Sequence, residues 1–216
     1  MAITEGDRLH DILVWEQEKY FSREDVTITS GESLSVGEVV GKIAYSVETT
    51  GTAGSNTGNG TMGSVTGGAS TKIGVYTMTC TAEASNAGTF SVIDPEGIAL
   101  DDATVAVAYT SDQINFTIAD GSEDFDIGDT FTVTVTAGAG TYSALDLTGT
   151  DGTQTAAGFV INDYDASSAA VDGVIIARDA KYVSDSLTWP AGITTAQKNA
   201  AKATLKSLGI IEMEEL

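Results

Sequence analysis

The stretch Ser184–Ile211 constrains the fold more than any other part of the chain, because its turn, cap and periodicity signals agree. Pro190 and Gly192 indicate a turn. Thr194 followed by Gln197 has the spacing of a capping box, in which two side chains satisfy free backbone N–H groups at the start of a helix. We therefore expect a helix that begins directly after Thr194.

The residues that follow have the period of an amphipathic helix. Ala201, Leu205 and Leu208 recur along a narrow apolar face. The solvated face carries three lysines: Lys198, Lys202 and Lys206. Gly209 is the expected end, because glycine adopts the left-handed conformation that ends many helices. Such a helix would lie on a sheet, which residues 210–211 would re-enter as a short strand.

A period-two pattern of apolar and polar residues marks the middle of the chain. It runs through residues 76–80, 105–109, 114–118 and 131–135, and residues 90–93 add a fifth strand. Turn-forming sequences such as DPEG and DG separate these segments. Strands at this spacing with one apolar face indicate a small antiparallel sandwich.

The charge and composition of this region differ from the rest. The formal net charge of the chain is -21, which argues against nucleic-acid binding, because phosphate contacts need clustered Lys and Arg. Residues 49–140 carry eleven acids against one base, Lys72. Within them, residues 49–71 are rich in Gly, Ser and Thr and too poor in apolar side chains to form a core. We interpret this tract as a flexible linker.

The sequence contains no convincing catalytic set. His10 is the only histidine, which excludes Ser-His-Asp and Cys-His nucleophiles and sites with several histidine ligands. Cys80 is the only cysteine and lies in an alternating apolar pattern, which indicates a buried structural thiol. We therefore expect neither enzyme activity nor a cofactor. No apolar run approaches twenty residues, so we expect no membrane span.

Acidic residues gather around one turn of the middle block: Asp120, Glu123, Asp124, Asp126 and Asp129. Carboxylates are hard oxygen ligands, so Asp120, Asp124 and Asp126 are candidates for a calcium site. Their order does not match an EF-hand loop. A solvated acidic turn that keeps the protein soluble is the alternative, and we expect no metal from the charge count alone.

Two separated blocks carry a family resemblance. The first contains YFSREDVTITSG (Tyr20–Gly31) and LSVGEVVGKI (Leu34–Ile43). The second, Asp151–Ile211, contains DGTQTAAGFVI, GVIIARDAKYV, LTWPAGITTAQKNAA and LKSLGI. In order and wording these blocks resemble the head decoration proteins of tailed bacteriophages, the family of the lambda-type capsid decoration protein. The block between them looks like the immunoglobulin-like insertions of phage structural proteins.

The resemblance implies an α+β fold that is mainly β. A small β domain with a C-terminal helix would comprise residues 1–48 and 141–216. It would be interrupted by the linker 49–71 and by an immunoglobulin-like β-sandwich at 72–140.

The implied function is structural. The protein would bind the outer surface of the expanded phage head as a homotrimer, contact the major capsid protein and stabilise the capsid lattice. The start MAITEGDRLHD lacks the features of a signal peptide, so assembly in the host cytoplasm is expected. Neither nucleic acid nor a membrane would be a partner. A display scaffold is the alternative, in which the inserted domain binds a glycan or receptor on the host surface.

A short apolar run lies between charged neighbours near the beginning of the chain: Ile12, Leu13, Val14 and Trp15. It fits a first strand or helix packed on its own core, because so short a window does not fix the period. It also fits an arm that adds a strand or an apolar anchor to a neighbouring capsid protein. The resemblance favours the arm, with Trp15 as the anchor.

Four residues near the end of the chain are expected in the core of the decoration domain or in trimer contacts: Trp189, Pro190, Leu205 and Leu208.

Overall fold

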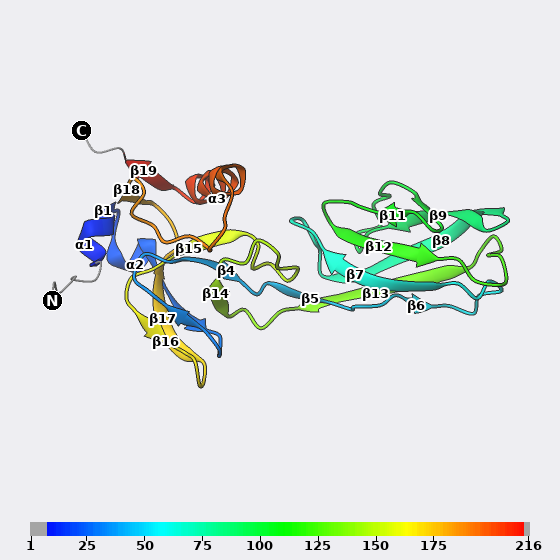
Figure 1. Ribbon diagram of the computed structural model, residues 1–216, viewed down its shortest axis with the longest axis horizontal. Helices are drawn as coiled ribbons and strands as arrows, with labels where there is room; N and C mark the ends of the chain where they lie inside the picture. Colours follow the sequence, from blue (N-terminus) through cyan, green and yellow to red (C-terminus); the bar gives the residue numbers. More distant parts are fainter. Residues whose placement is uncertain (1–7, 214–216) are drawn as a thin grey trace. The chain divides into compact units, whose positions relative to one another are not determined.

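The computed structural model describes residues 8–213 (Figure 1). The chain divides into two compact units: unit 1 is formed by its two ends, up to Ala44 and from Ala139, and unit 2 by Tyr45–Gly138. The described part is mainly strand, with α3 as its longest helix, in agreement with the predicted α+β class. No helix in residues 8–213 is long and apolar enough to cross a membrane.

Unit 1 contains, in chain order, α1 (Leu9–Ile12), β1 (Leu13–Glu16), α2 (Lys19–Ser22), β2 (Arg23–Ile28), β3 (Ser33–Leu34), β4 (Val39–Lys42), β14 (Tyr142–Ala144), β15 (Ala156–Val160), β16 (Tyr164–Asp165), β17 (Val171–Ile176), β18 (Ala180–Val183), α3 (Thr195–Ser207) and β19 (Ile210–Met213). Strands β14-β2-β17-β15-β4 close into a barrel, and β16 pairs with β3. Strands β1, β18 and β19 form a separate sheet.

Helix α3 confirms the sequence prediction for its start and end. Thr194 Oγ1 accepts from the backbone N–H of Gln197 at 3.3 Å, and Gln197 Oε1 accepts from the backbone N–H of Thr194 at 3.0 Å. Gly209 has a φ of +78°, as the expected stop requires. Ala201 and Leu205 are buried with Ile210 in one apolar cluster, so the helix is held by the sheet that β19 re-enters.

Unit 2 contains β5 (Tyr45–Val47), β6 (Thr52–Ala53), β7 (Thr61–Gly67), β8 (Gly74–Ala84), β9 (Ala87–Ile93), β10 (Ala103–Thr104), β11 (Ala108–Tyr109), β12 (Ile114–Ala119) and β13 (Thr130–Ala137). One antiparallel sheet has the order β10-β9-β8-β13-β5, with β6 also on β13, and a second has the order β11-β12-β7. Side chains of both sheets share one buried cluster, which makes the unit a sandwich. A specifically immunoglobulin-like connectivity stays a prediction.

The predicted strands 76–80, 90–93, 114–118 and 131–135 lie within β8, β9, β12 and β13. The predicted strand 105–109 is wrong, because the chain turns between β10 and β11. Ala106 lies at the turn with a φ of +61°, a conformation that no extended strand adopts. Cys80 is buried, as its alternating context predicts, and burial raises the pKa of its thiol.

The expected flexible linker 49–71 is instead part of the sandwich. It contributes β6 and β7, and β7 buries Met62 and Val65. The glycines have a packing role here, since a Cβ at Gly58 or Gly60 would lie 2.5 Å from the ring of Phe125. A tract poor in apolar side chains can therefore be ordered, because its small residues allow the backbone to approach an aromatic ring from a neighbouring segment.

A buried carboxylate fixes the turn that follows β9. Asp94 Oδ1 accepts from the backbone N–H groups of Glu96 and Ile98, both at 2.9 Å. Asp94 Oδ2 accepts from the Lys72 ammonium at 2.6 Å and from the amide of Gln113 at 3.3 Å. The bond from Lys72, followed by the other donors, lowers the pKa of Asp94 from 3.8 to about 2.

Replacing Asp94 should therefore give a pH-dependent loss of stability. The lowered pKa means that the carboxylate stabilises the fold above about pH 3.8, and that this contribution disappears as the pH falls towards 2. We expect Asp94→Asn to unfold at lower denaturant concentration than the parent at neutral pH, with a gap that narrows between these two pH values. Denaturant unfolding followed by circular dichroism at several pH values measures the stability of the parent and of the variant. Glu96→Gln is the control, because the Glu96 side chain is exposed and makes none of the hydrogen bonds to the Asp94 carboxylate. A gap that is independent of pH would contradict the assignment.

The capping box gives a second prediction. Thr194→Ala removes the acceptor of the Gln197 N–H and should lower the free energy of unfolding of unit 1 by about 1 kcal/mol. Thr195→Ala, one residue later and also exposed, keeps the cap and should change stability much less. The urea midpoints of the two variants measure this difference. Equal midpoints would show that the Thr194 cap does not stabilise unit 1.

Candidate binding surface

The outward face of the β1-β18-β19 sheet exposes apolar side chains in unit 1. The inward face buries Ala180, Tyr182 and Ile210 in the core. On the outward face Trp15 pairs in register with Lys181, which pairs in turn with Ile211. Trp15 is 49% exposed and Ile211 is 41% exposed. The Lys181 ammonium lies 6.0 Å from the centre of the Trp15 ring, within cation–π distance.

The predicted run 12–15 is divided between core and surface. Ile12 is 1% exposed and belongs to the main apolar cluster of unit 1, on which Leu13 also packs. A Cβ placed at Gly37 would lie 2.5 Å from Ile12 Cδ1, so the backbone of residue 37 lies directly against this side chain. Val14 and Trp15 are about half exposed. Ile12 and Leu13 thus hold the segment on its own unit, and contact with a capsid remains a prediction for Val14 and Trp15.

The four residues expected in core or trimer contacts are also divided. Leu205 is fully buried, and Trp189 packs on the same cluster with the Lys198 ammonium 5.7 Å from its ring centre. Pro190 is half-buried beside it. Leu208 is 36% exposed, because the helix ends before this residue and its side chain leaves the apolar face. Leu205 is therefore a core residue, and trimer contact stays a prediction for the exposed Leu208.

The acidic turn of unit 2 uses carboxylates as backbone acceptors. Asp129 is buried and accepts from the N–H groups of Thr57, Gly58 and Asp126 at 2.9, 2.9 and 3.1 Å. Asp124 Oδ1 accepts from the N–H of Asn86 at 2.8 Å. Among the residues that the structure describes, no three His, Cys, Asp or Glu side chains, Asp120 and Asp126 included, converge as metal ligands.

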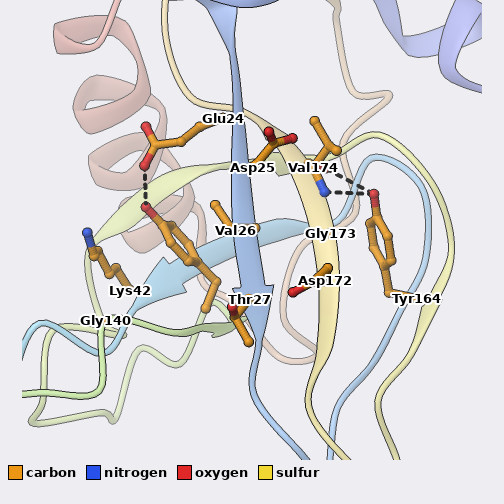
Figure 2. Close-up of a pocket in the computed structure, with 11 residues that line it drawn as sticks. Glu24, Asp25, Val26, Thr27, Lys42, Gly140, Tyr164, Asp172, Gly173 and Val174 are labelled. Carbon is orange, nitrogen blue, oxygen red and sulfur yellow. Dashed lines mark hydrogen bonds between the residues drawn. The ribbon is translucent and has the colours of Figure 1, made fainter.

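A groove of about 650 Å³ runs along β2 and β17. Figure 2 shows Glu24, Asp25 and Thr27 on the first of these strands and Asp172 and Val174 on the second. The tyrosines that line it hold structure together. Tyr164 OH accepts from the N–H of Val174 at 2.8 Å. Tyr142 OH donates to Glu24 at 3.4 Å, and burial, with the adjacent Glu24 charge, raises the Tyr142 pKa.

The sequence analysis did not predict that the short helix α2 exposes two aromatic side chains. Its Tyr20 is 95% exposed and Phe21 is 46% exposed, although both are aromatic. The available signal was the adjacent pair of aromatic residues among charged neighbours at 18–25. Exposed aromatic residues of this kind are frequent at interfaces.

A β scaffold with exposed apolar side chains on one small sheet is a structure suited to binding another protein surface. The profile of the family described as bacteriophage lambda head decoration protein D matches residues 2–210, and the chain belongs to this family. The family is structural, and membership makes the chain a component of the phage head. No curated protein matches the chain.

Two crystal structures of FlgL from Xanthomonas campestris, in space groups H3 and C2, are similar to part of the chain. Each is 18% identical over 55% of this chain, with TM-scores of 0.32 and 0.30. The matched part of this chain spans about a third of either FlgL chain, 34% and 33%.

Proposed function

We propose that the protein binds the outer surface of the expanded phage head as a homotrimer and stabilises the capsid lattice. Its main partner would be the major capsid protein, and its assembly would take place in the host cytoplasm. The observation that carries the proposal, beyond family membership, is the apolar outward face of β1-β18-β19, formed by Val14, Trp15 and Ile211.

The chemistry of this face suits a firm contact. Trp15 is large, rigid and only half-covered, and tryptophan is among the residues that contribute most to interface energies. Lys181 beside it offers a charge for an acidic group of the partner. Because Ile12 and Leu13 anchor β1 in the core, Trp15 is presented without an ordering cost at the moment of binding.

Stabilisation of the head would follow from mass action. A protein that binds the mature lattice and not the disassembled subunits stabilises the lattice by its binding free energy at each site. A trimer engages three sites at once, so each contact can be modest while the assembly remains tightly bound.

A display role for unit 2 is the second candidate, and its own buried core favours it. Unit 2 also exposes apolar side chains that its core does not use, with Ile73 57% and Ile98 56% exposed. In this function the sandwich would contact a glycan or receptor of the host, while unit 1 attaches it to the head.

The capsid contact predicts a specific loss of binding for Trp15→Ala. We expect the affinity for undecorated, expanded heads to fall by about 2 kcal/mol per site, or about thirtyfold, because the variant removes the largest exposed side chain of the face. Co-sedimentation measures the binding, and resistance of the heads to heating measures the stabilisation. Ile73→Ala, which removes an exposed apolar side chain from unit 2, is the matched control. Normal binding by Trp15→Ala would exclude this face as the contact.

Removing unit 2 separates attachment from display. The two chain crossings are adjacent, since Gly140 N–H donates to the Ile43 carbonyl at 2.9 Å and Ile43 N–H donates to the Thr141 carbonyl at 2.9 Å. Joining Ala44 directly to Ala139 should therefore close a short hairpin and leave capsid binding unchanged in co-sedimentation. Under the display function, adsorption of the phage to host cells would be lost. Adsorption equal to that of the parent phage would rule out the display role.

A further inference from the structure

Lys72, the one base in residues 49–140, lies against a buried carboxyl group in unit 2. Its Nζ is 2.6 Å from Asp94 Oδ2 and 2.6 Å from Glu96 Oε2. The Asp94 side chain is 0% exposed, whereas the side chains of Lys72 and Glu96 are 32% and 67% exposed. An amine, a buried carboxyl group and a second carboxylate that faces the solvent therefore meet at one point.

The two oxygens of the Asp94 carboxyl group have different surroundings. Oδ1 accepts from the backbone N–H groups of Glu96 and Ile98, both at 2.9 Å. Backbone donors placed in this way stabilise the negative charge that develops on an oxygen when a nucleophile attacks the carbon beside it. Oδ2 accepts from the Lys72 ammonium and from the amide of Gln113. One oxygen is thus fixed by the backbone, and the other lies beside the amine.

Tyr76 fixes the position of the groups around this carboxyl group. Its side chain is buried, and its OH accepts from the backbone N–H of Lys72 at 2.8 Å. The same OH donates to Gln113 Oε1 at 2.8 Å. The amine and the carboxyl group are therefore held together by the fold itself. Groups held in this way react with effective molarities of about 10⁵–10⁸ M in the best-oriented cases.

The residue that follows Asp94 removes a competing reaction. An aspartate side chain can cyclise to a succinimide when the backbone nitrogen of the next residue attacks its carboxyl carbon. That nitrogen belongs to Pro95 and carries no hydrogen, so a stable succinimide cannot form at this position. The carboxyl carbon of Asp94 is left with the Lys72 amine as its adjacent nucleophile.

We propose that Lys72 and Asp94 become joined by an intramolecular isopeptide bond. Lys72 Nζ attacks Asp94 Cγ, the N–C bond forms, and the bond from Cγ to Oδ2 breaks. One of the three ammonium protons stays on the amide nitrogen, and the other two leave with Oδ2 as water, so the step needs no co-reactant. Glu96 carries protons from the nitrogen to the departing oxygen. The product links the start of β8 to the end of β9 and is independent of the proposed capsid contact.

The ion pair determines how fast this bond forms. Pairing raises the pKa of Lys72 and lowers the pKa of Asp94, so a neutral amine beside a protonated carboxyl group is a minor form. This form has as many protons as the ion pair, so its population is independent of pH between the two pKa values. Fresh protein therefore holds the ion pair, on which the acid dependence predicted for Asp94→Asn rests. It converts slowly, at the same rate at about pH 6 and about pH 9.

The direct test is the intact mass of the full chain during storage at neutral pH. We expect the loss of about 18 Da, the mass of one water molecule, and a branched peptide that joins Lys72 to Asp94 after proteolytic digestion. The linked protein should have a higher denaturant midpoint than fresh protein, because a cross-link restricts the unfolded chain. It should also no longer lose stability between pH 3.8 and about 2, since the Asp94 carboxylate is consumed.

Two variants and a second ion pair are the controls. Lys72→Arg keeps a cation beside Asp94, but its guanidinium stays protonated, so the mass should not change. Glu96→Gln keeps both reacting groups and should convert about a hundredfold more slowly. Lys202 Nζ also lies 2.6 Å from Glu212 Oε1, yet the nearest backbone donor of that carboxylate is at 3.4 Å, and this pair should remain unlinked. Circular dichroism checks that each variant is folded.

The results that would overturn the proposal are distinct. A constant mass of the full chain would exclude the bond. An equal loss of water from Lys72→Arg would assign the change to another reaction, such as succinimide formation at Asp151-Gly152. A rate that rises about tenfold with each pH unit would exclude proton exchange within the ion pair. Unchanged conversion of Glu96→Gln would remove Glu96 from the step.

Discussion

The pairing of β4 with β14 is the contact on which the rest of unit 1 depends. Residues 40–42 pair with residues 142–144, although unit 2 lies between them in the sequence. Tyr142 also pairs with Ile28 of β2, so this single strand closes the barrel. Loop-closure entropy grows only slowly with loop length, and a compact insertion whose ends already pair adds less still. The barrel can therefore accept the whole of unit 2 as an insertion at this hairpin.

The parts of the fold that the sequence predicted best are those determined by local chemistry. The cap at Thr194 and the stop at Gly209 depend on a few neighbouring residues, and both were located correctly. Burial alternates along β12, and along residues 76–80 of β8 and 131–135 of β13, because one face of each sheet is buried and the other is not. In these strands the alternation of apolar and polar residues follows directly from the burial of one face, so the pattern alone is enough to predict the strand.

The predictions failed where contacts between residues distant in the sequence determine the local structure. The tract 49–71 lacks apolar side chains, but its glycines fit against Phe125, which no local composition reveals. Val107 continues an alternating pattern and is nevertheless 56% exposed in a turn. Among the candidate site residues, the sequence placed Ile12, Leu13, Val14 and Trp15 in one run, and it could not separate the exposed Val14 and Trp15 from the buried Ile12. That separation depends on the contact of Ile12 with Gly37, which lies in another segment.

The position of Ile12 beside Trp15 also relates stability to binding. Burying Ile12 fixes α1 and the start of β1, and the pairing of β1 with β18 then directs Trp15 outward next to Lys181. An arm that was free before docking would lose backbone entropy of about 1–2 kcal/mol for each residue that becomes ordered. In this structure that cost is already met by the folding of unit 1. Rigid presentation therefore favours a contact made by a few exposed side chains, which is the arrangement that a repeated, multivalent attachment requires.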